Sequence, residues 1–310
     1  MSVTRAPVPA PIEHRGRRPS VALYLTVVAA LVVPANVVAA DLGADAQHPD
    51  QGSGLVQLAL YGQAVIPAVA ALLAWAVART RPTWGFRRAS WRSLGAAWLV
   101  GVLAVALSYA GVWLSGAGRF AAAGWSGTWG GLPSMLVVPT GLVMGVLPWM
   151  ALAVGEELGW NSFLAPRLAA RLRADRTALA VGGLWAAFHL PLILLVPGAV
   201  PVGVPTLWTA AWFVVECVAL AYPLVWLRLR TGSLWPALVL HGSFNAALYL
   251  VAEPATRATA STGWFSDEGG LLTSVGTVLA VILTRRLWRV GSDSVGQGRR
   301  RPCTRRARRA

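Results

Sequence analysis

The sequence predicts an all-α, polytopic transmembrane helix bundle of about eight spans, with both termini in the cytoplasm. Hydrophobic residues make up 56% of the 310 residues and charged residues only 13%, with a mean hydropathy of +0.57. Soluble domains carry about 25% charged residues. The apolar residues also form runs of the ~20 residues that a membrane-spanning helix needs, and the charges between the runs differ in sign on the two sides of the membrane.

Eight apolar segments are long enough, or nearly long enough, to cross a bilayer. In chain order they cover residues 21–40, 55–78, 94–115, 134–164, 177–197, 206–227, 233–252 and 270–288. The fourth segment is too long for one minimal span. We expect Pro139 and Pro148 to kink it, or its first part to lie at the membrane interface.

The basic residues predict the orientation of the chain. All of them are Arg, and all 27 except Arg119 and Arg257 lie before residue 21, in 79–93, 165–176 and 228–232, or after residue 284. The other loops hold half of the 12 acidic residues. Because cytoplasmic loops of membrane proteins are enriched in Lys and Arg, both termini are predicted to be cytoplasmic.

The net charge of +15 is also typical of nucleic-acid-binding proteins. Here the Arg residues are clustered between apolar runs, which favours a membrane protein with no nucleic-acid partner. The two cysteines, Cys217 and Cys303, have no zinc-finger spacing. The Arg-rich, Lys-free composition is typical of a GC-rich bacterial gene and places the protein in a bacterial cytoplasmic membrane.

The same pattern divides the chain into five parts. They are a cytoplasmic basic segment at 1–20, transmembrane helices at 21–133, a core with the unusual polar residues at 134–252, a last transmembrane helix at 253–290, and a disordered Arg-rich cytoplasmic tail at 291–310.

Polar residues inside the predicted spans are the candidate functional residues. They are Glu156 and Glu157 in the fourth span, His189 in the fifth, Glu216 in the sixth, and His241 with Asn245 in the seventh. An ionisable residue at the centre of a span costs ~2.5–3.5 kcal/mol on insertion and therefore indicates function. Counted from the Arg at the end of each span, these groups lie ~16–22 Å deep and share one layer of the membrane.

A layer of carboxylates, imidazoles and a carboxamide is suited to hydrolysis. A Glu takes a proton from water, one His orients that water, and the other His and the Asn donate hydrogen bonds to an oxyanion. Two His and a Glu can instead hold zinc, and the same groups can relay protons or cations in a transporter. We expect Glu157 to pair with Arg167. Glu216 either belongs to the site or bonds a neighbouring helix.

Three ordered segments around these residues resemble the CPBP family of CAAX-protease and bacteriocin-processing membrane proteins, relatives of the type II CAAX prenyl endopeptidase. They are EELGW at 156–160, WAAFHLP at 185–191 and SLWPALVLHGSFN at 233–245, and the resemblance covers about residues 134–252. It implies a membrane-embedded endopeptidase that acts on a peptide or membrane-protein substrate, which enters laterally or from the cytoplasmic side.

The resemblance also implies residue roles. Glu156 would activate water, His189 would assist it, and His241 with Asn245 would stabilise the oxyanion. The family has been described both as metal-free glutamate proteases and as metalloproteases. The cofactor is therefore either none or zinc, and zinc would be held by Glu156, His189 and His241.

One departure from the family pattern affects the supporting residues Glu157 and Asn161. The family usually has Arg then Gly after the Glu pair, where this chain has Asn161 then Ser162. Asn can bond a carboxylate but cannot cancel its charge, and Arg167 lies more than one helical turn further on.

This departure leaves open a catalytically impaired member that acts as a membrane binding or immunity protein. A proton- or cation-coupled transporter is a second alternative, although the sequence lacks the internal repeat and paired broken helices typical of that class.

Overall fold

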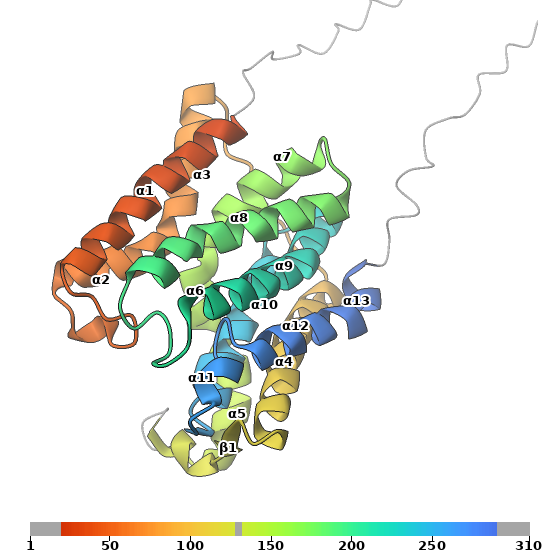
Figure 1. Ribbon diagram of the computed structural model, residues 1–310. Coiled ribbons are helices and arrows are strands. Elements are labelled where there is room, and N and C mark those ends of the chain that lie inside the picture. The colour runs from red at the N-terminus through yellow and green to blue at the C-terminus, as the bar shows by residue number, and fades with distance from the viewer. Residues whose placement is uncertain (1–19, 128–131, 290–310) are drawn as a thin grey trace, which may run out of the picture.

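The computed structural model describes residues 20–127 and 132–289, and within them the protein is built almost entirely of helices (Figure 1). The exception is an antiparallel pair of short strands, β1 (Gly118–Phe120) and β2 (Thr256–Ala258), with Arg119 opposite Arg257. The all-α class predicted from the sequence is confirmed. The predicted tail at 291–310 with Cys303, and the basic segment except for Ser20, lie outside the described residues.

Nine helices, some of them short 3-10 helices, lie before residue 158 in the described chain. In chain order they are α1 (Val21–Asp41), η1 (Pro49–Gln51), α2 (Gly54–Tyr61), η2 (Gly62–Val65), α3 (Ile66–Ala78), α4 (Trp91–Leu114), η3 (Ala122–Gly127), α5 (Ser134–Val143) and α6 (Val146–Glu157).

The remaining helices include two π-helical segments, η4 and η5. In chain order they are η4 (Leu158–Leu164), α7 (Ala165–Ala169), α8 (Ala174–Leu195), α9 (Thr206–Thr231), α10 (Trp235–Ala247), η5 (Leu248–Ala252), α11 (Thr262–Phe265), α12 (Leu271–Leu283) and α13 (Arg285–Arg289).

Seven helical stretches in the described chain are long and apolar enough to cross a membrane. They are Val21–Asp41, Gly54–Ala78, Trp91–Leu114, Ser134–Ala169, Ala174–Leu195, Thr206–Thr231 and Trp235–Ala252, and they coincide with the first seven predicted segments. The fourth stretch is interrupted after α5, between Pro139 and Pro148, as the two prolines predict. The orientation of the termini stays a prediction.

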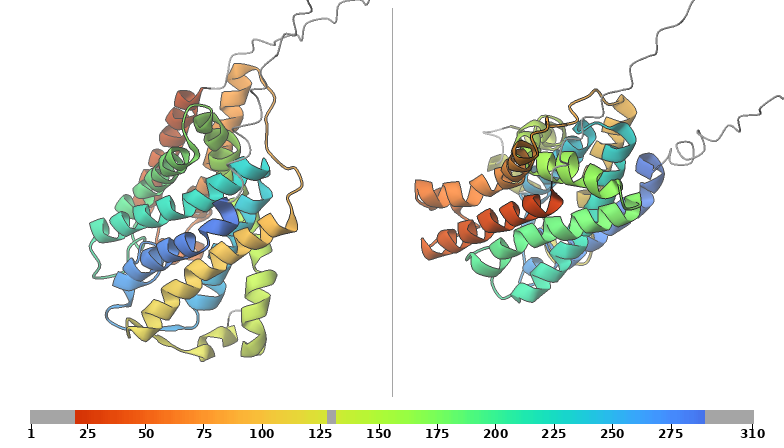
Figure 2. Two further views of the ribbon diagram at one scale, coloured as in Figure 1. Left: turned by 90° about the vertical axis from the view of Figure 1, so that its right-hand side faces the viewer. Right: turned by 90° about the horizontal axis from the view of Figure 1, so that it is seen from above.

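The predicted eighth span at 270–288 is instead divided into α12 and α13, with Thr284 between them. Helix α12 has only 13 residues, which is ~20 Å of helix against the ~30 Å of a bilayer's hydrocarbon core. Figure 2 shows α12 running between α4 and α9, the helices it contacts most. Ser108 Oγ on α4 donates to the Thr273 carbonyl, and Ser274 Oγ donates to the Trp212 carbonyl of α9.

Small residues bring the motif-bearing helices close together, as is usual in membrane bundles. A Cβ added at Gly242 of α10 would lie 2.9 Å from the Val146 carbonyl oxygen of α6. A Cβ added at Gly155 would overlap the Ala64 carbonyl oxygen, which lies beside the start of α3. Glycine at these two positions therefore lets α6 lie directly against α10 on one side and against η2 and α3 on the other.

Candidate active site

Three neighbouring helices and a π-helical segment carry the predicted site residues. Glu156 and Glu157 end α6, Asn161 lies in η4, His189 lies in α8, and His241 with Asn245 lies in α10. Helix α10 packs against α6, and α8 follows η4 through the short helix α7. The three motifs that are separate in sequence therefore meet in space.

The Glu156 carboxylate is held by the indole of Trp185. Trp185 Nε1 donates to Glu156 Oε2 over 2.7 Å, a short distance that is typical of hydrogen bonds to charged acceptors. Glu156 is half-buried, and among the described residues none donates to its other oxygen. One carboxylate oxygen is therefore fixed, and the other can accept a further hydrogen bond.

His189 takes its orientation from the same turn of α8. Its Nδ1 lies 3.0 Å from the Trp185 carbonyl oxygen. Because a carbonyl oxygen only accepts, we assign the hydrogen to Nδ1, which leaves the Nε2 lone pair available. The imidazole contacts Phe188 and Phe213, with ring centroids 4.9 and 5.2 Å apart, and these aromatic rings restrict its position.

Glu157 is buried and uses both of its carboxylate oxygens. His241 Nδ1 lies 2.9 Å from Oε1, and Asn161 Nδ2 donates to Oε2 over 2.7 Å. The predicted pairing of Glu157 with Arg167 is wrong. Arg167 instead donates to the Phe163 carbonyl and lies 3.7 Å over the Phe163 ring, because it is too far along the helix to turn back to Glu157.

Trp185 also lies between the two histidines. Its ring centroid lies 5.4 Å from that of His241 and 6.1 Å from that of His189. The Glu156–Trp185–His189 group and the Glu157–His241–Asn161 group therefore face each other across one indole. We refer to these six residues as the polar cluster.

Two predicted candidates form no side-chain hydrogen bond with the described residues of the polar cluster. Asn245 is half-buried one turn after His241, and no side-chain hydrogen bond joins it to the described residues of the cluster. Glu216 is buried in α9, where its Oε2 accepts from the Gly269 amide over 3.2 Å. Of the two alternatives left open for Glu216, the structure therefore shows the bond to a neighbouring segment.

The side chains proposed as zinc ligands are not arranged as a metal site. Within residues 20–127 and 132–289, no three His, Cys, Asp or Glu side chains are grouped so as to hold one metal ion. The Nδ1 atoms of the two histidines are directed to Trp185 and Glu157, which is how metal-ligating histidines are usually held. It is the grouping of Glu156, His189 and His241, and not these bonds, that departs from a zinc site.

A cavity of about 460 Å³ lies beside the polar cluster and has His189 in its wall. Three acidic residues from the loops that follow α10 and α11 also line it, namely Glu253, Asp267 and Glu268. Burial and the charge of Asp267 raise the pKa of Glu268, and burial raises the pKa of Glu253 well above its usual range. The sequence assigned these three acids only to loops, because the sequence of a loop does not show which cavity the loop borders.

Both motif helices change to π-helical geometry next to the candidate residues. Segment η4 begins directly after Glu157, and η5 begins three residues after Asn245. Such π-helical turns are rare and occur frequently at functional sites. The sequence did not predict them, nor did it assign a role to Trp185, although the position of Trp185 one turn before His189 was a usable signal.

The comparisons with known proteins agree with the geometry. Residues 137–247 match the family model described as type II CAAX prenyl endopeptidase Rce1-like. No curated protein matches the chain. The matched segment contains all six residues of the polar cluster as well as Asn245. The chain is therefore an integral, multi-pass membrane protein whose segment 137–247 is similar to the Rce1-like CAAX proteases, as the three motifs predict.

Proposed function

We propose that the protein is an intramembrane endopeptidase in which Glu156 activates a water molecule. One observation carries the proposal. The Glu156 carboxylate is fixed at one oxygen by the Trp185 indole and has its second oxygen available, and the Trp185 carbonyl also holds His189. A carboxylate that is held in place and has one oxygen free to accept a proton is a candidate general base.

The proposed first step is attack of water on the scissile carbonyl carbon. Glu156 takes one proton from the water as the new C–O bond forms. His189 accepts a hydrogen bond from the same water at Nε2, which fixes the direction of attack. The Phe188 and Phe213 rings around His189 limit access of other water molecules to this point.

The negative charge that develops on the carbonyl oxygen needs donors. His241 is suited to this role because its Nδ1 bond to Glu157 stabilises the protonated ring, whose Nε2–H then donates to the oxyanion. The Asn245 carboxamide supplies a second donor once substrate is bound. When the C–N bond breaks, Glu156 returns its proton to the leaving nitrogen.

Asn161 replaces part of what the family's usual Arg supplies. Its amide donates to Glu157 and fixes the carboxylate, and His241, when protonated, balances the charge of Glu157. The substrate that we propose is the leader peptide or tail of a membrane-associated protein. The Glu253, Asp267 and Glu268 cavity beside His189 offers space for the chain on one side of the scissile bond.

The test compares three versions of the full-length protein expressed in cells that lack the gene. They are the wild type, Glu156→Gln and Glu216→Gln, and the readout is the set of N- and C-termini in the membrane proteome, measured by mass spectrometry. We expect new termini with the wild type and with Glu216→Gln, and none with Glu156→Gln. Glu216 is a matched control because it is also an intramembrane Glu but bonds the Gly269 amide and no residue of the polar cluster.

Identical termini for the wild type and Glu156→Gln, with equal expression, would contradict the mechanism. The alternative would then be a binding or immunity protein with the same fold. The replacement of the family's Arg by Asn161 is the observation that favours this alternative.

A further inference from the structure

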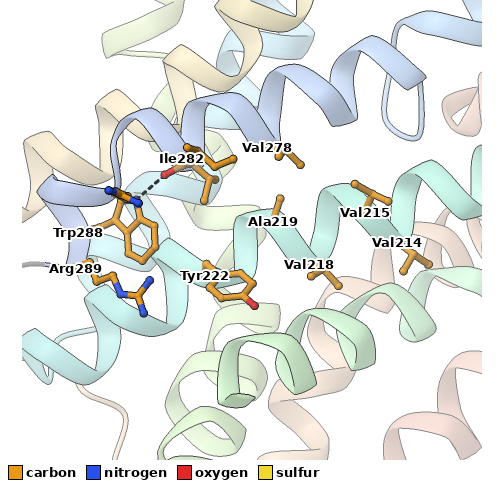
Figure 3. Close-up of a pocket in the computed structure, with 11 residues that line it drawn as sticks. Val214, Val215, Val218, Ala219, Tyr222, Val278, Ile282, Trp288 and Arg289 are labelled. Carbon is orange, nitrogen blue, oxygen red and sulfur yellow. Dashed lines mark hydrogen bonds between the residues drawn. The ribbon is translucent and has the colours of Figure 1, made fainter. Parts of the chain in front are cut away.

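A second cavity shares no lining residue with the polar cluster. It is a groove of about 480 Å³ lined by α9, α12 and α13. Figure 3 shows its apolar residues along the two facing helices and its basic and aromatic residues gathered at one end. The apolar lining consists of Val214, Val215, Val218, Ala219, Tyr222, Val278, Val281 and Ile282, and the end is formed by Arg285, Trp288 and Arg289.

The two arginines at the end of the groove differ in their surroundings. Arg289 is fixed, because its Nη2 lies 2.6 Å from Asp175 Oδ2 and its guanidinium lies 5.0 Å over the Trp226 ring. Arg285 is exposed and forms no hydrogen bond or ion pair with the described part of the chain. This end of the groove therefore carries an uncompensated positive charge next to an apolar channel.

The groove faces the lipid rather than a buried interface. Helix α9 is a membrane-spanning candidate, and α12 is an apolar helix. Val215 and Ile282 line the groove and remain exposed, so hydrocarbon of the bilayer reaches it directly. From Val214 to Tyr222 the apolar wall extends ~12 Å along α9, a length suited to part of an acyl chain.

We propose that this groove binds one anionic phospholipid of the surrounding bilayer. An acyl chain lies between α9 and α12, and the phosphate of the headgroup lies on Arg285 and Arg289. Trp288 closes the end of the channel as a buried wall, since its Nε1 already donates to the Val281 carbonyl. Basic residues beside transmembrane helices are a recognised means of binding anionic headgroups.

The site is independent of peptide cleavage, so its test does not require activity. The detergent-purified full chain is mixed with phosphatidylglycerol or with phosphatidylcholine of the same acyl chains, and retained lipid is counted by native mass spectrometry. We expect one phosphatidylglycerol to be retained in preference to phosphatidylcholine. Arg285→Gln should weaken that retention about fivefold, because it removes the direct contact of one Arg with the phosphate.

The matched control for charge is Arg286→Gln. Arg286 is the next residue of the same helix and is also exposed, but it does not line the groove. The substitution Arg286→Gln therefore removes the same charge from nearly the same place. We expect Arg286→Gln to leave phosphatidylglycerol retention within about twofold of the wild type, because a general surface attraction is all that it changes.

A second pair of variants tests the acyl channel without changing any charge. Val215 lines the groove and is 37% exposed, whereas Val275 on α12 is 38% exposed and lies outside it. Val215→Trp should fill the channel and lower retention, and Val275→Trp should not. Because both positions face the lipid, neither substitution requires the core to repack.

Two results would overturn the proposal. Equal losses in Arg285→Gln and Arg286→Gln, with no effect of Val215→Trp, would mean that anionic lipid is attracted by diffuse surface charge. Equal retention of phosphatidylcholine and phosphatidylglycerol by the wild type would mean that the groove does not recognise the headgroup.

Discussion

At the scale of single residues, the two adjacent glutamates have different partners, and the roles that we propose for them rest on this difference. Glu157 is buried with both oxygens bonded, to His241 and Asn161. Glu156 is half-buried with one oxygen bonded, to Trp185. A carboxylate whose lone pairs are occupied orients its neighbours, and one with a free oxygen can accept a proton. The geometry therefore supports Glu156 as the base and Glu157 as a positioning residue.

Trp185→Phe tests the bond that holds Glu156. The substitution keeps an aromatic ring but removes the N–H that donates over 2.7 Å. Hydrogen bonds to charged groups are worth about 1.5–3 kcal/mol, so we expect cleavage to slow roughly 10- to 100-fold in single-turnover assays with a substrate found by the terminus comparison.

The control for this substitution is Trp160→Phe. Trp160 is also buried, but its Nε1 has no hydrogen-bond partner among the described residues. Its replacement should leave the cleavage rate close to that of the wild type. Equal slowing in both variants would show that ring packing, and not the bond to Glu156, matters at position 185.

Asn161→Asp tests the support of Glu157. The new side chain has nearly the same shape but replaces the amide that donates to Glu157 Oε2 with a second carboxylate oxygen. Two buried acceptors in contact repel each other, so we expect a larger loss of thermal stability than in Asn161→Ala. The measurement is thermal unfolding in detergent, and equal unfolding temperatures for the two variants would contradict the bond.

The sequence predicted the candidate residues but only some of their contacts. Motif spacing and depth in the membrane predict that Glu156, His189 and His241 lie near one another, and all three contact Trp185. The sequence did not predict that Arg167 would lie on Phe163. The Phe163 ring is within reach of Arg167, whereas the Glu157 carboxylate is more distant. The sequence also left Glu216 undecided, because its partner is a backbone amide in a loop.

At the scale of helices, the contact between α6 and α10 sets the distance from Glu157 to His241. Gly242 lies at this contact, and an added Cβ would be 2.7 Å from Met150 Cγ and 2.9 Å from the Val146 carbonyl oxygen. The backbone oxygen cannot rotate away as a side chain can. The two helices would therefore have to separate to accommodate any larger residue.

Gly242→Ala should lower both stability and activity. Overpacking of this kind costs about 1–3 kcal/mol, and the separation lengthens the 2.9 Å contact of His241 with Glu157. The matched control is Gly183→Ala in α8, where an added Cβ meets nothing within 4 Å. We expect the control to unfold at the wild-type temperature or slightly above it, because Ala favours helix over Gly.

Helix positions were the most predictable part of the fold. Long apolar runs are sufficient to locate seven spans, since the bilayer imposes both their length and their composition. The π-helical segments η4 and η5 were not predictable, because they depend on which backbone carbonyls meet which amides after packing. The division of 270–288 into α12 and α13 depends likewise on the contacts of α12 with α4 and α9.

At the scale of the whole molecule, the acidic cavity beside His189 makes stability depend on pH. The pKa of Glu268 is raised by burial and by the Asp267 charge. The pKa of Glu253 is raised by burial and by Asp267 and Glu268. An acid with a higher pKa in the folded state holds more protons there than in the unfolded state. Its contribution is therefore complete below the unfolded pKa and is lost as the pH rises through the folded pKa.

We accordingly expect the unfolding temperature to fall as the pH rises from about 4.3, the ordinary pKa of Glu, towards neutrality. Glu268→Gln should reduce this dependence, since the Gln side chain stays neutral at every pH. The measurement is thermal unfolding in detergent across the pH series. Asp50→Asn, which removes an exposed acid outside the cavity, should retain the wild-type slope, and an unchanged slope in Glu268→Gln would contradict the assignment.

The shortness of α12 has a mechanical consequence for the bilayer. Its 13 residues present Leu279, Ile282 and Leu283 to the lipid, and arginines follow immediately in α13. A hydrophobic length of ~20 Å is shorter than the ~30 Å hydrocarbon core, and such a mismatch costs a fraction of a kcal/mol per Å unless the bilayer is thinner there. The protein should therefore prefer thinner membranes. In a bilayer of mixed lipids, it should accumulate where the acyl chains are shorter.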